Sequence, residues 1–154
     1  MNKLCDEKFI KELLKRHGFR FSKSMGQNFL IDETVPERIA ESAELCNGTG
    51  VLEIGPGIGS LTYELCKRAD RVVAVEVDAA LPPLLEETLR EYNNLTLIKG
   101  DILKTDINAL IDRHFYQLTP VVCANLPYNI TSPVLTSLIK AETFETMVLM
   151  VQRE

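Results

Sequence analysis

Short apolar runs alternate with longer stretches of helical periodicity along the 154-residue chain. Apolar runs predict buried β-strands at 51–54, 71–75, 95–98, 121–124 and 146–151. The stretches between them repeat apolar residues every three or four positions and predict helices at about 6–17, 32–46, 60–68, 80–92, 108–115 and 131–141. Wholly apolar strands that alternate with helices are typical of a parallel sheet covered on both faces. The pattern therefore predicts an α/β fold.

Residues with strong backbone preferences mark the ends of several predicted helices. Gly18 is expected to end the first helix, because glycine readily adopts the left-handed conformation at a helix C-terminus. Asp32 is expected to cap the second helix, whose first turn tolerates Pro36. Pro82 and Pro83 are expected at the start of the fourth helix, where a missing backbone N–H costs little.

The last predicted strand is followed only by Gln152-Arg153-Glu154. A doubly wound sheet is expected to continue beyond such a strand, because the strand otherwise presents an unpaired edge. We therefore expect the fold to be incomplete at its C-terminal end. The alternative is a complete miniature domain.

The net charge of −5 does not indicate a nucleic-acid-binding protein, although the charge is unevenly distributed. Basic residues gather in the N-terminal stretch, at Lys8, Lys11, Lys15, Arg16, Arg20 and Lys23. They form either a local basic patch or a solvated helix face followed by a flexible arm.

The four cysteines lack the paired spacing of metal ligands or of a disulfide framework. We expect reduced thiols, no metal site and a cytoplasmic location. The charged N-terminal stretch is unlike a signal peptide, and no apolar run is long enough to span a bilayer, so we expect no membrane association.

The segment Asn125-Leu126-Pro127-Tyr128 directly follows the fourth predicted strand. The carboxyl ends of parallel strands are where open α/β sheets bind ligands. The Asn125 side-chain oxygen and the Leu126 carbonyl are suited to accept the two N–H bonds of an exocyclic amine, and Tyr128 is suited to stack on the attached ring. This constellation predicts a methyltransferase that acts on an amino nitrogen.

A glycine-rich loop follows the first predicted strand and opens a helix, with Gly55, Gly57 and Gly59 as its glycines. Glycines there let the backbone approach a ligand closely, which fits a dinucleotide pyrophosphate as well as an adenosyl cofactor. Glu53 beside the loop favours a ligand with an ammonium or sulfonium group. The alternative is that Glu53 pairs with a nearby helix N-terminus.

Two further acids end the second and third predicted strands. Glu76 is placed to accept hydrogen bonds from two ribose hydroxyls, and we prefer it to Asp78 because it directly ends the apolar run. Asp101 is placed to accept a hydrogen bond from an adenine amine, or alternatively to cap a helix. Each acid alone is a weak signal, but their joint placement with the glycine loop and the Asn125 segment is a strong one.

The chain resembles the rRNA adenine N6,N6-dimethyltransferases, in particular the bacterial small-subunit KsgA/RsmA type. The resemblance runs from Lys23-Ser24-Met25-Gly26-Gln27-Asn28-Phe29-Leu30 through the glycine loop to Asn125-Leu126-Pro127-Tyr128-Asn129-Ile130-Thr131-Ser132-Pro133. Antibiotic-resistance relatives that modify large-subunit rRNA typically carry Ile in place of Leu126 and a Lys-containing loop in place of Pro56-Gly57-Ile58. Those differences favour the small-subunit branch.

The resemblance implies a Rossmann-like class I methyltransferase fold, S-adenosylmethionine as cofactor, ribosomal RNA of the small subunit as partner, and a monomer. It places cofactor contacts at Asn28, Leu30, Gly55, Glu76, Asp101 and Asn125. Reasoning from the residues adds Glu53, Gly57 and Gly59, and assigns catalysis to Asn125, Leu126, Pro127 and Tyr128.

The resemblance also divides the chain into two parts. Residues 1–31 are expected to form an N-terminal helix and a segment that contacts cofactor or RNA, and residues 32–154 a partial methyltransferase domain. Family members continue with further strands and a helical C-terminal domain, which this sequence lacks. A further aromatic residue that sandwiches the target base is expected beyond Glu154.

The expected reaction is direct methyl transfer to adenine N6, without a strong general base. Neither His17 nor His114 is expected at the site. Two alternatives are a large-subunit rRNA methyltransferase and a mainly non-catalytic ribosome-assembly module that binds RNA through its basic N-terminal stretch. An NAD-dependent oxidoreductase is a third, but it leaves the Asn125–Tyr128 segment unexplained.

Overall fold

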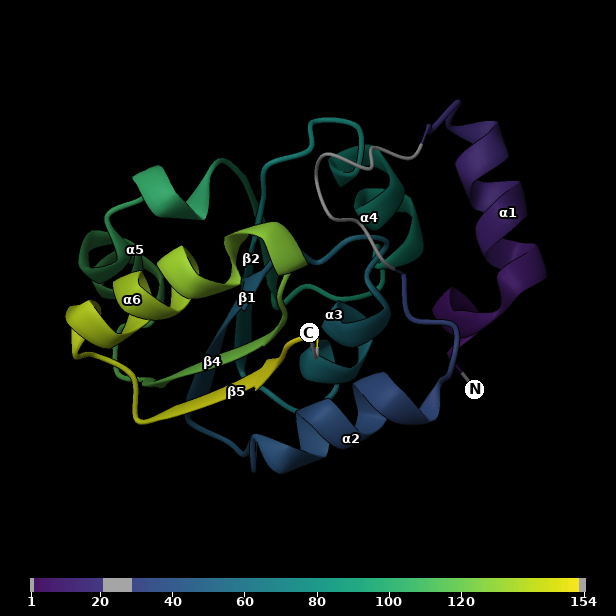
Figure 1. The fold of residues 1–154 in the computed structure, drawn as a ribbon. Helices are drawn as coiled ribbons and strands as arrows, with labels where there is room; N and C mark the ends of the chain where they lie inside the picture. Colours follow the sequence, from purple (N-terminus) through teal and green to yellow (C-terminus); the bar gives the residue numbers. More distant parts are fainter. Residues whose placement is uncertain (1, 21–28, 153–154) are drawn as a thin grey trace.

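A computed structural model describes residues 2–20 and 29–152, and its centre is one parallel sheet (Figure 1). The described strands are β1 (Thr49–Ile54), β2 (Arg71–Glu76), β3 (Leu95–Lys99), β4 (Thr119–Asn125) and β5 (Thr146–Met150), in the order β3-β2-β1-β4-β5. The chain adds strands outward from β1 to β3 and then returns to the other side of β1. This reversal creates a topological switch point between β1 and β4, where open sheets of this kind bind ligands.

Helices cover both faces of the sheet (Figure 1). They are α1 (Glu7–Arg16), α2 (Thr34–Ser42), α3 (Ser60–Cys66), α4 (Pro82–Thr88), α5 (Ile107–His114) and α6 (Thr131–Ala141). Successive residues of a strand point to opposite faces. Leu52 of β1 therefore packs with α5 and α6. Val51, its neighbour, packs with α2 and α3 on the other face. The fold thus matches the predicted α/β architecture.

The first and fourth helices pack against each other and against the glycine-rich loop. Leu13 of α1 and Leu85 of α4 are fully buried in one cluster with Ile58 of the loop. The Asp6 side chain caps α1 by accepting the Phe9 N–H at 2.8 Å. Gly18 follows α1 with φ +61°, the left-handed conformation predicted for a residue that ends a helix.

The predicted strands and helices are all present, but α2 and α4 each end about four residues earlier than expected. Asp32 accepts the Thr34 N–H at 2.9 Å, as predicted for a capping residue. The prediction that this helix reaches Cys46 is wrong, because Glu44 turns left-handed at φ +48° and stops α2 at Ser42. Pro82 and Pro83 begin α4 as predicted, but the prediction that this helix reaches Tyr92 is wrong, because α4 ends at Thr88.

Among the described residues, no helix is long and apolar enough to cross a membrane.

Candidate active site

The glycine-rich loop joins β1 to α3 through three left-handed glycines. Gly55, Gly57 and Gly59 have φ values of +67°, +61° and +93°, which residues other than glycine rarely adopt. A Cβ atom on Gly59 would lie 2.9 Å from side-chain atoms of both Leu85 and Leu89. The loop therefore needs glycine at position 59 for close packing on α4 as well as for its backbone conformation.

Glu53 on β1 is a buried acid, only 1% exposed, beneath this loop. Burial raises the pKa of its carboxyl group to about 8; the nearby Thr62 hydroxyl opposes this shift and the negative charge of Glu76 adds to it. Within the described ranges, its Oε2 atom is buried without a hydrogen-bond partner. Because Glu53 also lines a pocket, this oxygen is suited to a hydrogen-bond donor or a cation that enters there.

Glu76 ends β2 and connects that strand to the glycine-rich loop. Its carboxylate accepts the backbone N–H of Gly57 at 3.3 Å and that of Asp78 at 2.9 Å. Burial raises the pKa of Glu76, and these backbone hydrogen bonds oppose the rise. The sequence left a choice between Glu76 and Asp78; Glu76 is the one that lines the pocket.

Asp101 follows β3, and it fits both of the roles left open by the sequence. Its side chain accepts the Leu103 N–H at 3.0 Å and so caps a short 3₁₀-helix, Ile102–Lys104. The residue also lines the same pocket as Glu76. A carboxylate that accepts one bond from the cap retains lone pairs for a ligand.

The Asn125–Tyr128 segment leaves the sheet at the end of β4, beside the glycine-rich loop. Its backbone is tied to the edge strand, because Leu126 N–H donates to the Met150 carbonyl at 3.0 Å. Pro127 lies so close to the loop that a Cβ atom on Gly55 would be 3.4 Å from its ring. Tyr128 opens a 3₁₀-turn, Tyr128–Ile130, with 53% of its surface exposed.

One pocket collects most of the residues predicted from the sequence. They are Leu30, Glu53, Gly55, Gly57, Glu76, Asp101, Asn125, Leu126 and Pro127. Gly59 and Tyr128 do not line it: Gly59 packs against Leu85 and Leu89, and Tyr128 is exposed at the surface. Asn28 falls outside the described residues. The pocket thus offers carboxylates at the ends of β1, β2 and β3, and amide and carbonyl groups after β4.

Other pocket residues were not assigned a role from the sequence, among them Phe29, Val77, Ile102, Ile130 and Gln152. Val77 and Ile102 each directly follow a predicted acid, so their place after a strand end was the available signal. Gln152 comes two residues after β5, at the same edge of the sheet as Asn125. These residues add four apolar side chains and one amide to the pocket lining.

The histidines lie away from this pocket. His17 pairs with Glu87 on α4 at 2.6 Å, and His114 ends α5. In the parts of the chain that the structure describes, no group of three or more His, Cys, Asp or Glu side chains is arranged to hold a metal ion.

Comparisons with known proteins agree with the resemblance seen in the sequence. The family model for ribosomal RNA adenine dimethylase matches residues 18–154. The ribosomal RNA small subunit methyltransferase A of Bacillus pumilus is 47% identical over 146 residues, which cover 94% of this chain and 50% of that protein. The chain therefore spans about half the length of the curated relatives that it matches.

Solved structures of related enzymes share the fold. The 23S rRNA methyltransferase ErmE has a TM-score of 0.71 and 35% identity, covering 81% of this chain and 48% of that one. A dimethyladenosine transferase from Plasmodium falciparum has a TM-score of 0.65 and 33% identity, covering 79% and 42%. With a family model that matches most of its length, this chain belongs to the ribosomal RNA adenine dimethylase family.

Proposed function

We propose that the pocket binds S-adenosylmethionine. The observation that carries this proposal is the convergence of Glu53, Glu76 and Asp101 on one pocket beneath a glycine-rich loop. Glu53 supports this ligand over a dinucleotide, because a buried acid whose Oε2 atom has no hydrogen-bond partner among the described residues suits a cation and disfavours a pyrophosphate.

Each acid has a distinct part of the cofactor to hold. Glu76 accepts the two ribose hydroxyls, and Asp101 accepts the adenine amine. Val77 and Ile102, the apolar residues that follow these acids, flank the adenine ring between them. Glu53 and the glycine-rich loop face the methionine part, with its ammonium and sulfonium charges. Asn28 and Leu30 contact the cofactor from the N-terminal part of the chain. Residues 1–31 thus contact cofactor and RNA, and residues 32–154 form the partial methyltransferase domain.

We infer that the Asn125–Tyr128 segment presents the methyl acceptor, an adenine amine. When bound, S-adenosylmethionine supplies an electrophilic methyl group. Asn125 Oδ1 and the Leu126 carbonyl accept the two N–H bonds of the amine, which localises the nitrogen lone pair that the ring otherwise delocalises. Tyr128 stacks on a base withdrawn from its helix, and its surface exposure fits that role. Positioning and electrostatics then supply the acceleration, and the displaced proton passes to water.

We further propose that the acceptor is an adenosine of small-subunit ribosomal RNA, and that the protein acts as a cytoplasmic monomer. The identity to small-subunit enzymes and the residues Leu126 and Pro56-Gly57-Ile58 support the small-subunit substrate over the large-subunit one.

Substitution of Asn125 by Ala tests the catalytic assignment. Transfer of labelled methyl groups from S-adenosylmethionine to unmethylated small-subunit particles or their RNA is expected to fall about a hundredfold or more, because one acceptor of the amine is lost. Binding of S-adenosylmethionine should change by less than about tenfold.

The matched control is Asn108→Ala, which removes an exposed amide on α5 and should leave transfer unchanged. Wild-type rates in the Asn125 variant, or no transfer by the wild-type chain to either substrate, would contradict the proposal.

A further inference from the structure

The first described residues lie against the glycine-rich loop. Asn2–Cys5, called here the N-terminal clamp, contains a short 3₁₀-turn at Lys3–Cys5, and Asn2, Leu4 and Cys5 are buried. Leu4 belongs to the apolar cluster that includes Ile58 of the loop. A polar residue inside such a packed region must have hydrogen-bond partners, so the partners of Asn2 show what the clamp holds.

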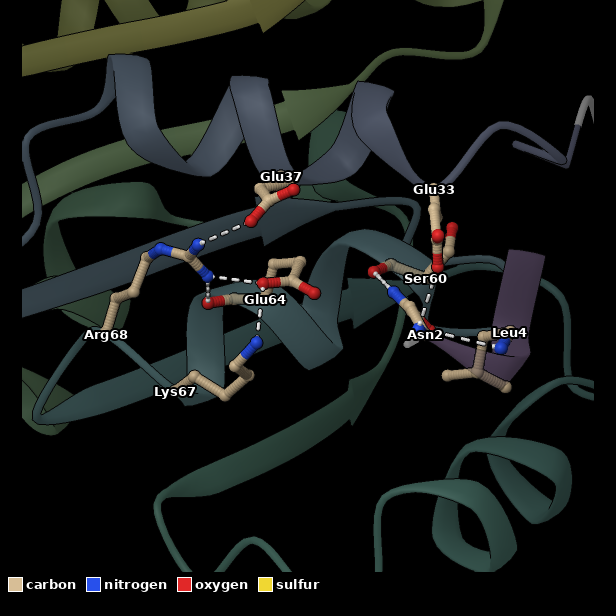
Figure 2. A network of polar contacts seen from close by, with 8 residues as sticks. All are labelled: Asn2, Leu4, Glu33, Glu37, Ser60, Glu64, Lys67 and Arg68. Carbon is tan, nitrogen blue, oxygen red and sulfur yellow. Dashed lines mark hydrogen bonds and ion pairs between the residues drawn. The ribbon is translucent and has the colours of Figure 1, made fainter.

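Asn2 connects to separate parts of the chain through three hydrogen bonds, drawn in Figure 2. Its side-chain Nδ2 donates to the Ser60 carbonyl at 2.9 Å, and its Oδ1 accepts the Leu4 N–H at 3.1 Å. Its backbone N–H donates to Glu33 Oε2 at 3.2 Å. Because one partner is a carbonyl and the other an N–H, only this orientation of the amide satisfies both.

One of these partners lines the pocket, and another lies three residues after a lining residue. Ser60 is the first residue of α3, directly after Gly59, and itself lines the pocket. Glu33 directly precedes α2 and follows Leu30, another lining residue, by three positions. Asn2 thus ties the end of the glycine-rich loop to the segment that enters α2, although it does not line the pocket itself.

A second polar connection joins the same two helices away from the pocket (Figure 2). Arg68 contacts the carboxylate of Glu64 near the end of α3 and lies 4.0 Å from Glu37 on α2. Lys67 pairs with Glu64 at 3.1 Å. None of these residues lines the pocket, so this connection can be weakened without reaching the pocket walls.

We propose that Asn2 is a positioning residue for the cofactor site. It holds the start of α3 and the segment leading into α2 at the spacing that the ligand requires, and it acts through Ser60 and Glu33 without touching the ligand. This inference rests on the proposed binding of S-adenosylmethionine, and it extends the site to a residue 58 positions from Ser60 in the sequence.

The test compares dissociation constants for S-adenosylmethionine, measured by calorimetry, in two variants of Asn2 and one of Glu37. Asn2→Asp keeps the size of the side chain and the acceptor for Leu4, but removes the donor to Ser60. Asn2→Ala removes both. Asn2→Asp is expected to bind about three- to tenfold more weakly, the loss typical of one hydrogen bond, and Asn2→Ala at least as weakly. Glu37→Ala breaks the contact with Arg68 and should bind within about twofold of wild type.

Wild-type affinity in the Asn2 variants would overturn the proposal. An equal loss in Glu37→Ala would overturn it too, because the effect would then follow from general loosening of α2 against α3. If Asn2→Ala fails to fold, the isosteric Asn2→Asp carries the comparison.

Hydrogen exchange of the unliganded chain separates this proposal from the proposed function. Amides at 57–63 in Asn2→Asp should exchange about three- to tenfold faster than in wild type, relative to amides of α6 in the same sample. Unchanged exchange would overturn the positioning role whether or not the cofactor binds. Failure of the wild-type chain to bind S-adenosylmethionine would instead contradict the proposed function and leave the exchange result to decide the role of Asn2.

Discussion

Glu53 and Glu76 show how one set of residues serves both the fold and the site. Glu76 uses its carboxylate to hold Gly57 and Asp78 in place, yet it remains at the pocket wall. Glu53 is buried with an oxygen that lacks a partner among the described residues, which is costly for folding. A residue that a folded core tolerates at such cost is a candidate for function, and a ligand with a positive charge would supply the missing partner.

The raised pKa of Glu53 predicts how stability depends on pH. A carboxyl group with a folded-state pKa of about 8 binds its proton more tightly in the folded chain than in the unfolded chain, where the pKa is near 4.5. Its contribution is fully present below pH 4.5 and is lost as the pH rises to about 8. The Tm of Glu53→Gln should therefore fall less steeply over this pH window than the Tm of wild type. Burial also raises the pKa of Glu76, so the Glu76 carboxyl group adds to the loss of stability with rising pH in both proteins. Parallel Tm profiles for the two proteins would contradict the assignment.

At the scale of elements, sequence pattern located the strands and helices better than it located their ends. Leu89 and Tyr92 continue the apolar spacing of α4, but the helix stops at Thr88, because these residues pack in a turn against neighbouring side chains instead of extending the helix. Tyr92 meets Tyr63 edge to face with ring centroids 5.7 Å apart. Apolar periodicity reports burial, and burial persists beyond the end of a helix.

The packing of the glycine-rich loop on α4 requires glycine at position 59, and only the structure shows this requirement. Gly59→Ala should destabilise the chain by about 1–3 kcal/mol more than Gly48→Ala in urea unfolding. Both glycines have a left-handed backbone, at φ +93° and +86°, so both variants share the backbone strain. Only the new methyl group at position 59 would overlap Leu85 and Leu89, whereas nothing lies within 4 Å of a Cβ atom at position 48. Equal losses of stability would mean that the loop can move away from α4.

At the scale of the molecule, the pocket was predictable because parallel strands bring their carboxyl ends to one edge. Glu76 and Asn125, which end β2 and β4, and Asp101, which follows β3, could therefore be placed together from the sequence alone. The contribution of Asn2 could not be foreseen, because its contact with Ser60 joins positions far apart in the sequence and leaves no periodic signal. The environment of Glu53 was also visible only in the structure, where burial raises the pKa of its carboxyl group to about 8.

The most direct test of the central claim is calorimetric titration of the folded chain with S-adenosylmethionine, with NAD as the competing ligand. We predict saturable binding of S-adenosylmethionine and none of NAD. Affinity for S-adenosylmethionine should fall about tenfold or more in Glu76→Gln, because the variant loses charged hydrogen bonds to the ribose. The affinity of the control Glu86→Gln, which alters an exposed acid on α4, should be unchanged. A folded chain that binds neither ligand, or that binds NAD as tightly, would contradict the account.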